Sequence, residues 1–253
     1  MIDLSMVGVG MGAPDHLTRQ AEAVLCAADI ILIPTKGEEK AELADVRRRL
    51  CDHLEVPIER RAEFELPTRN ANGDYLQGVR NWHDAVARAW AAVLAERLPI
   101  GGRAALMIWG DPSLYDSSLR IAERLPALGL VTRTRVTPGL TSLQVLTAAF
   151  AMPLNRLGAP VHITTGRLLR DGGWPAGSDD VAVMLDGGAA FSSLAPDGID
   201  IYWGAYLGMP QQILREGPLP QTGRDIIHAR EEARARHGWI MDTYLLRRRG
   251  GLT

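Results

Sequence analysis

The chain has 253 residues, 46% of them hydrophobic and 23% charged, with a formal net charge of −2. This composition is typical of a globular protein with one large or two small domains. The balanced charge argues against a general nucleic-acid binder, so an acidic substrate would need a local group of Arg and Lys side chains. The sequence shows neither a signal peptide nor an apolar run of membrane-spanning length, and we therefore expect a cytoplasmic protein with no membrane segment.

The N-terminal segment predicts a strand, a helix and a second strand. Residues 2–9 form an apolar strand that ends in Gly8-Val9-Gly10-Met11-Gly12, helical spacing covers 17–28, and a strand at 30–33 is stopped by Pro34. This order is typical of a parallel βαβ unit with a right-handed crossover.

The first glycine turn also fits a nucleotide-binding pattern. Gly8-x-Gly10-x-x-Ala13 matches the dinucleotide fingerprint, which is weak by itself. The fingerprint needs an acid for the ribose at the end of the second strand, where this chain has Pro34-Thr35-Lys36. An NAD site is therefore disfavoured. A nucleotide-binding oxidoreductase or binding module using this turn stays open as the alternative from another class, as does a tight turn that binds nothing.

The next two helices are amphipathic. Leu43, Val46, Leu50 and Leu54 share one helical face, and the arginines at 47–49 are interpreted as a solvated face. A strand is predicted over 56–66 and a long helix over 74–97.

The two cysteines, Cys26 and Cys51, both fall in helical patterns, and neither has a CxxC partner. We expect both to be buried, reduced thiols. His83 lies beside the apolar stripe of the long helix without a second ligand at suitable spacing, so we expect no metal site.

The stretch Gly110-Asp111-Pro112-Ser113-Leu114-Tyr115 follows an apolar strand predicted over 103–109 and precedes a helix predicted over 114–125. Gly110 would let a ligand approach the backbone, and Pro112 fixes φ and removes a donor. A turn after a strand lies at the carboxyl edge of an α/β sheet, where ligands bind. An ordinary loop with a turn-forming Asp explains this stretch equally well by itself.

A third turn marks the predicted domain boundary. A strand over 131–136 leads into Thr137-Pro138-Gly139-Leu140-Thr141-Ser142 and a helix over 143–149. Hydroxyls and free amides at such a helix start can bind polar groups. We expect α/β domains at 1–138 and 139–253. In the second, we expect strands at 161–165, 181–185, 199–207 and 239–246, a loop at 171–180 and a helix at 224–237.

Three pieces now stand in order: Val7–Gly12 with Leu17-Thr18 and Ala28-Asp29, Gly110–Tyr115, and Thr137–Ser142 with Met152-Pro153-Leu154. Together they resemble the S-adenosylmethionine-dependent tetrapyrrole (precorrin and uroporphyrinogen) methylases over nearly the whole chain. This resemblance implies two α/β domains with the methyl-donor cleft between them, and a homodimer. The family's first turn usually reads Gly-Pro-Gly, whereas this chain has Met11 in place of the proline.

Other stretches narrow the resemblance. Residues 33–41 leading to 47–51, and Tyr202-Trp203-Gly204-Ala205-Tyr206-Leu207-Gly208, resemble the deacetylating members of the family in cobalamin biosynthesis. This implies a C-methyltransferase that methylates carbon 1 of precorrin-5 and releases acetate. Another precorrin methyltransferase of the same family is the nearest alternative.

The resemblance also implies site residues. The donor S-adenosylmethionine, and its product S-adenosylhomocysteine, should contact Gly10, Met11, Gly110, Asp111, Leu114, Thr141, Ser142, Met184 and Gly204. Asp111 could bind polar groups or act as a base, and Tyr115 could donate a hydrogen bond to the substrate, so these two are the expected catalytic residues. The sulfonium is already activated, so the protein mainly positions two reactants.

The tetrapyrrole substrate carries many carboxylates, which makes basic side chains candidates for binding it. The candidates are Lys36, Lys40, Arg167 and Arg170, with Lys36 and Arg167 favoured because each follows a predicted strand. Solvent exposure explains each of them equally well. The sequence does not identify the groups that deliver water or stabilise the oxyanion during deacetylation.

Overall fold

The structure is a computed structural model that describes residues 1–35, 41–68 and 75–250. The chain forms two compact units, Met1–Thr141 and Ser142–Thr253. The sequence predicts domains at 1–138 and 139–253. Whether these segments are domains that fold independently stays a prediction.

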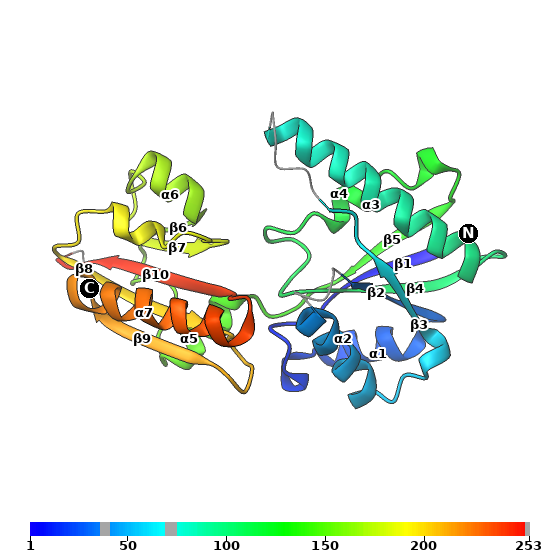
Figure 1. Ribbon diagram of the computed structural model, residues 1–253, viewed down its shortest axis with the longest axis horizontal. Helices are drawn as coiled ribbons and strands as arrows, with labels where there is room; N and C mark the ends of the chain where they lie inside the picture. Colours follow the sequence, from blue (N-terminus) through cyan, green and yellow to red (C-terminus); the bar gives the residue numbers. More distant parts are fainter. Residues whose placement is uncertain (36–40, 69–74, 251–253) are drawn as a thin grey trace. The chain divides into compact units, whose positions relative to one another are not determined.

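The first unit is a five-stranded sheet with helices on both faces (Figure 1). All its strand pairs are parallel, and the strand order is β3-β2-β4-β1-β5. The strands are β1 (Ile2–Gly8), β2 (Ile30–Thr35), β3 (Arg61–Glu65), β4 (Gly102–Ile108) and β5 (Thr132–Thr137). The helices are α1 (Arg19–Ala27), α2 (Ala41–His53), α3 (Tyr75–Arg97) and α4 (Ser118–Ala122), with 3-10 turns at Pro14–His16, Ile58–Arg60 and Pro126–Leu128.

Alternating strand residues divide the core of this unit into two layers, because successive side chains of a strand point to opposite faces. Val7, Ile31 and Met107 pack with α1 and α2 on one face. Met6 and Leu106 pack with α3 and α4 on the other. The connections after neighbouring strands therefore leave on opposite faces, which creates crevices at the carboxyl edge of the sheet.

The structure confirms one prediction for the strands of this unit and corrects another. β1 and β2 are parallel strands of one sheet, as the predicted βαβ unit requires, and β4 lies between them. Pro34 does not stop the second strand, since it pairs with Phe64 of β3. The pairing of β2 with β4 has already ended at Leu32, so the missing N–H of Pro34 costs no bond on that side.

Other elements of the first unit are shorter than predicted. β3 covers only part of 56–66 because a 3-10 turn, Ile58–Arg60, precedes it. α4 begins at Ser118 rather than 114, because Tyr115 has φ +52° and the Asp116 carboxylate accepts a 2.6 Å hydrogen bond from the Ser118 N–H. Cys51 is buried, but Cys26 is exposed, contrary to expectation.

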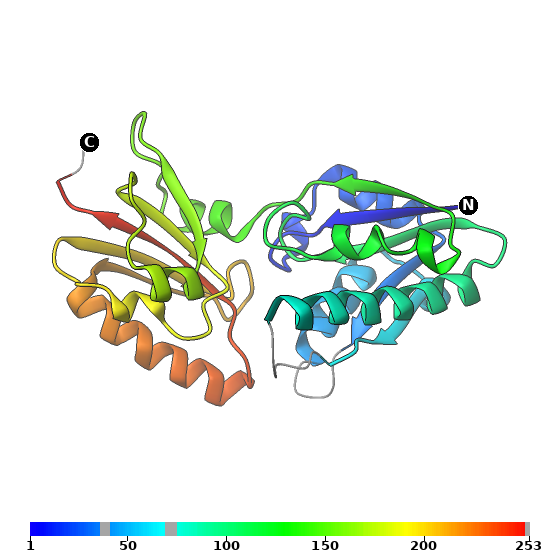
Figure 2. The same ribbon diagram turned by 90° about the horizontal axis from the view of Figure 1, so that it is seen from above.

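The second unit is a mixed sheet of order β6-β7-β10-β8-β9, with α7 packed on β8 and β9 (Figure 2). β6 and β7 are parallel, whereas β10 runs antiparallel to both of its neighbours. The strands are β6 (Val161–Thr165), β7 (Asp180–Met184), β8 (Ile199–Ala205), β9 (Ile213–Pro218) and β10 (Asp242–Arg248). The helices are α5 (Ser142–Ala149), α6 (Gly166–Gly172) and α7 (Leu219–His237), with a 3-10 turn at Ala190–Ser193.

The sequence analysis missed two elements here. It did not predict β9, whose exposed edge position leaves no apolar alternation to detect. It also missed α6, which Thr165 caps by accepting a hydrogen bond from the Leu168 N–H, and which overlaps the start of the loop predicted at 171–180. Positive φ angles at Leu185 and Tyr206 end β7 and β8 earlier than predicted.

Within the described ranges, no helix is both long and apolar enough to cross a membrane. In the same part of the chain, no group of three or more His, Cys, Asp or Glu side chains is placed to hold a metal ion.

Candidate active site

Three glycine turns meet at the carboxyl edge of the first sheet, after β1, β4 and β5. Gly10 and Gly110 exchange backbone hydrogen bonds of 2.8 and 3.4 Å. A side-chain carbon on Gly8 would lie 2.6 Å from the Gly139 nitrogen and 2.7 Å from the Gly110 oxygen. The three turns therefore touch through their backbones, and this contact requires glycine at Gly8 and Gly139. We call this contact the glycine junction (Gly8, Gly10, Gly110 and Gly139).

Gly110 differs from the other members of the glycine junction. It has φ +65°, and the nearest atom to an added side-chain carbon would be the Thr141 Cα at 3.6 Å. Space therefore remains beside Gly110, which suits close approach of a ligand to the backbone. Gly10, with φ +66°, instead faces the His16 side chain, whose Nδ1 accepts a 3.4 Å hydrogen bond from the buried Met11.

Asp111 braces the glycine junction. Its Oδ2 accepts a 2.9 Å hydrogen bond from the Gly139 N–H. Its Oδ1 accepts from the Ser113 N–H at 2.8 Å and the Ser113 hydroxyl at 2.5 Å. Partial burial alone would raise the pKa of Asp111, but these hydrogen bonds outweigh it and hold the pKa below its ordinary value. This geometry favours a positioning role for Asp111, while its action as a base stays a prediction.

The other predicted residues of the first unit lie around the same edge. Leu114 is half-buried and follows the Asp111 turn. Tyr115 is 41% exposed, and partial burial raises the pKa of its hydroxyl. Thr141 is half-buried at the end of the first unit, and the next residue, Ser142, begins the second unit as a buried residue of the first turn of α5. The structure thus groups the first-unit candidates around the glycine junction.

The candidates of the second unit share the carboxyl edge of their own sheet. Met184 ends β7 and is half-buried. Gly204 lies near the end of β8, where an added side-chain carbon would meet Leu207 at 2.6 Å and Leu146 at 2.9 Å. Arg167 follows β6 as a residue of α6. The parallel direction of β6, β7 and β8 places these three residues at one edge.

The predicted basic residues differ in their surroundings. Arg167 and Arg170 are exposed, and Asp171 lies 3.9 Å and 3.6 Å from their respective guanidinium nitrogens. Part of their charge is therefore balanced locally. Lys36 and Lys40 lie outside the described residues.

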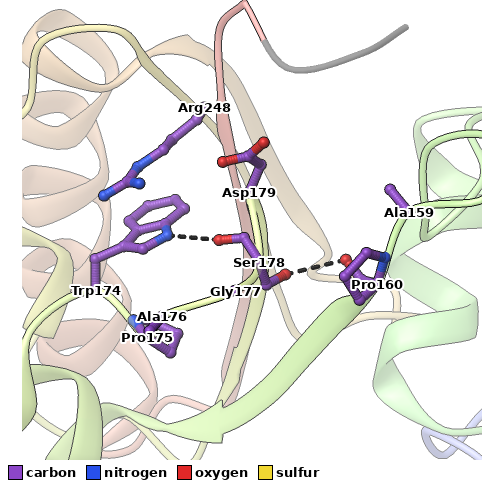
Figure 3. Close-up of a pocket in the computed structure, with 9 residues that line it drawn as sticks. All are labelled: Ala159, Pro160, Trp174, Pro175, Ala176, Gly177, Ser178, Asp179 and Arg248. Carbon is purple, nitrogen blue, oxygen red and sulfur yellow. Dashed lines mark hydrogen bonds between the residues drawn. The ribbon is translucent and has the colours of Figure 1, made fainter.

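A hollow of about 500 Å³ lies at the opposite, amino edge of the second sheet (Figure 3). Arg248 lies over the Trp174 ring at 4.4 Å, and the indole N–H of Trp174 donates to the Ser178 carbonyl at 2.8 Å. Ser178 also donates from its hydroxyl to the Pro160 carbonyl at 3.0 Å. These polar groups already bond one another, and none of the predicted site residues lines this hollow.

Comparison with known proteins identifies the family. The sequence profile of the Tetrapyrrole (Corrin/Porphyrin) Methylases matches residues 3–222. The chain belongs to this family. Among its tetrapyrrole methylase relatives, the chain is 44% identical to the precorrin-6A synthase [deacetylating] of a Sinorhizobium species, over 98% of this chain and 96% of that protein. It is 28% identical to the cobalt-precorrin-2 C(20)-methyltransferase of Salmonella typhimurium, over 60% of this chain and 58% of that one.

Solved structures agree with the tetrapyrrole methylase assignment. A Corynebacterium diphtheriae protein described as cobalamin-synthesis-related (CobF) superposes with a TM-score of 0.84 at 38% identity, covering 98% of this chain and 99% of that chain. A uroporphyrin-III C-methyltransferase of Thermus thermophilus, solved with S-adenosylhomocysteine, has a TM-score of 0.60 at 16% identity, with 96% of each chain covered. The similarity to the Thermus thermophilus enzyme, at 16% identity, shows only that the two chains share a fold.

The tetrapyrrole methylase assignment replaces the dinucleotide-binding alternative. The strand order also differs from that of a dinucleotide-binding fold. Such a fold places its first strand between the second and the fourth, whereas here β4 lies between β1 and β2.

The structure also corrects the interpretation of one arginine. Arg47 is not on a solvated face, since it is half-buried and its Nε donates to the Met107 carbonyl at 3.3 Å. Its guanidinium lies 5.8 Å from the centre of the Trp109 ring. Burial lowers the pKa of Arg47 to about 10, so it stays charged at neutral pH. Spacing could have revealed this, because residues 43, 47, 50 and 54 share one helical face.

Asp186 was missed as well. It is buried after β7, where it accepts hydrogen bonds from the Ala190 N–H at 2.6 Å, the Gly188 N–H at 3.0 Å and the Tyr244 hydroxyl at 2.7 Å. Its side chain fills the space beside Gly166. A lone Asp after a strand gives no sequence signal of such a network.

Proposed function

We propose that the chain is a precorrin-6A synthase (deacetylating). In this function, it transfers a methyl group from S-adenosylmethionine to carbon 1 of precorrin-5, with loss of acetate, and gives precorrin-6A. The observation that supports this most strongly is the 44% identity to a precorrin-6A synthase [deacetylating], because it extends over 98% of this chain and 96% of that protein. Relatives that act on precorrin-2 match only about three fifths of the chain, at 28–29% identity.

The proposed donor site uses the glycine junction. Gly110 leaves room for a ligand at its backbone, and Gly10, Met11, Asp111 and Leu114 surround that turn. The bound donor would supply an activated methyl group. The backbone N–H groups and hydroxyls at the start of α5, at Thr141 and Ser142, would bind its polar atoms. In the second unit, we propose Met184 and Gly204 as further donor-binding residues.

Within this proposal, the chain's residues act mainly by positioning. Asp111 holds the Gly110 and Gly139 turns together and so fixes the backbone that faces the donor. Tyr115, whose hydroxyl stays protonated at neutral pH, would donate a hydrogen bond to the macrocycle. Arg167 and Lys36 would pair with its carboxylates, at about 1.5–3 kcal/mol for each desolvated contact. We also propose that the protein is cytoplasmic and forms a homodimer. Sedimentation of the purified protein tests the homodimer.

The experiment is a substrate panel. The purified enzyme is incubated with methyl-labelled S-adenosylmethionine and either precorrin-5 or precorrin-2, and the tetrapyrrole is analysed by mass spectrometry. Label in precorrin-5 alone supports the proposal. Label in precorrin-2 would instead assign the chain to another methylation step of the family.

A further inference from the structure

A second cavity, of about 300 Å³, lies within the first unit beside the glycine junction. Its lining includes Pro34, near the carboxyl end of β2, and Trp109, directly after β4. α2 leaves β2 on one face of the sheet and α4 leaves β4 on the other, so this is a point where neighbouring connections diverge. Ligands of open α/β sheets bind at such points.

Trp109 lines this cavity, directly precedes Gly110 in the sequence, and lies against the turn after β1. A side-chain carbon on Gly12, in the turn after β1, would lie 3.0 Å from the Trp109 ring and 2.9 Å from Val46 of α2. The same indole carries the Arg47 guanidinium over its face. A group held in the cavity would therefore lie one side chain away from the turn that we assign to the donor.

Two buried donors that line this cavity have no acceptor within the described part of the chain. Trp90 is 3% exposed, and among the described residues neither its indole N–H nor that of Trp109 has a hydrogen-bond partner. Both residues line the cavity. A buried N–H without an acceptor costs about 1–3 kcal/mol, so two of them beside one cavity indicate a ligand that accepts hydrogen bonds.

The charge of the cavity selects the kind of acceptor. Arg47 places a cation at its wall, where partial desolvation strengthens pairing with an anion. Asp116 also lines it, where its carboxylate accepts a 2.6 Å hydrogen bond from the backbone N–H of Ser118 and interacts electrostatically with Arg47, so a bound anion would share the Arg47 charge with Asp116. A planar group with two acceptor oxygens fits one guanidinium and two indole donors better than a single hydroxyl does.

We propose that this cavity binds a short carboxylate through Arg47, Trp90 and Trp109. The ligand is either free acetate or an acid arm of the macrocycle, and this choice of sources rests on the proposed function. The cavity thereby becomes a subsite for the acyl group that the enzyme removes or for an arm that anchors the substrate.

The test is a titration of ¹⁵N-labelled protein with sodium acetate, followed through the indole N–H resonances. Sodium chloride at equal ionic strength is the ion control. Trp174 and Trp203 are internal controls, because their indole N–H groups already donate to Ser178 and Asp242. The Trp90 and Trp109 resonances should shift downfield and saturate with acetate, while the other two stay in place.

Matched variants test the contacts. Arg47→Met should weaken acetate binding about tenfold or more, whereas Arg49→Met, which removes an exposed arginine from the same helix, should not change it. Trp109→Phe keeps a ring but removes one donor, and should weaken the acetate response of Trp90. This second variant covers the case in which Arg47→Met fails to fold.

A competition experiment distinguishes free acetate from an acid arm of the substrate. Uroporphyrin, a polycarboxylate macrocycle, should displace acetate from the cavity if an arm of the substrate is the ligand, and leave it bound if free acetate is. Equal shifts in acetate and chloride, no shift at all, or full acetate affinity in both Arg47→Met and Trp109→Phe would overturn the proposal. The titration uses neither donor nor precorrin, so its outcome is independent of methyl transfer.

Discussion

Replacing Asp111 by Asn tests whether this residue braces the glycine junction. The carboxylate accepts from two donors of Ser113 at one oxygen and from the Gly139 N–H at the other. An Asn amide has one acceptor oxygen, so its NH₂ group must face either Ser113 or Gly139. At least one charge-assisted hydrogen bond is lost, and a donor is left facing a donor.

The expected loss follows from the geometry. A hydrogen bond to a charged group contributes about 1.5–3 kcal/mol, so Asp111→Asn should lower the free energy of unfolding by roughly 2–3 kcal/mol. For a chain of this size, that is a fall in Tm of about 5–10 °C. Because the pKa of Asp111 lies below its ordinary value of 3.8, its ionised form stabilises the fold. The advantage of the wild type should therefore be full at neutral pH and shrink as the pH falls through the folded-state pKa.

The assay is urea unfolding followed by circular dichroism at pH 7 and at descending pH. Glu96→Gln is the matched control, because it exchanges an exposed carboxylate for an amide in the same unit. The control should unfold like the wild type. Wild-type stability of Asp111→Asn at pH 7, or a loss that stays constant down to low pH, would refute the bracing role.

Three further substitutions test the site and the buried ion pair of the second unit. Gly110→Val should raise the dissociation constant of S-adenosylhomocysteine, because the side chain enters the space beside the turn and φ +65° disfavours it; an unchanged constant in calorimetry would contradict this. Gly8→Ala should lower the free energy of unfolding by at least about 1–3 kcal/mol, because the added carbon would contact the Gly110 and Gly139 backbone. In the control Gly172→Ala, the added carbon meets no atom within 4 Å, so its stability should not change. Equal melting temperatures of the two variants would contradict the close contact at the glycine junction. Arg230→Met removes the cation beside the buried Asp242 carboxylate, which keeps only the hydrogen bond from the Trp203 indole, and should lower the free energy of unfolding by about 3–5 kcal/mol at pH 7. Burial already raises the pKa of Asp242, so this loss should shrink at pH 5, and an equal loss at both values would argue against it.

The convergence of the glycine turns could be predicted because it follows from topology. Turns after parallel strands meet at one edge of a sheet, and the structure places Gly10 beside Gly110 there. The order of the strands could not be predicted from these turns. β4 lies between β1 and β2 although it follows both in the sequence. Local sequence patterns do not encode which distant strands pair.

The charged residues show a different limit. The run at 47–49 reads as a solvated face when composition alone is considered, yet Arg47 shares the spacing of the apolar residues and is half-buried, while Arg49 is exposed. Asp186 and Asp111 resemble each other in sequence as single acids after strands. Only the fold distinguishes the buried network of Asp186 from the partly open turn of Asp111.

In the proposed function, one enzyme couples methyl transfer to the loss of an acetyl group. The most direct measurement is the ratio of acetate released to methyl groups transferred, with precorrin-5 and methyl-labelled S-adenosylmethionine, from the product mass and an enzymatic acetate assay. The proposal predicts one acetate for each labelled methyl group, and a tetrapyrrole that has gained the methyl and lost the acetyl group. Labelled tetrapyrrole that keeps its acetyl group, with no acetate in solution, would contradict it.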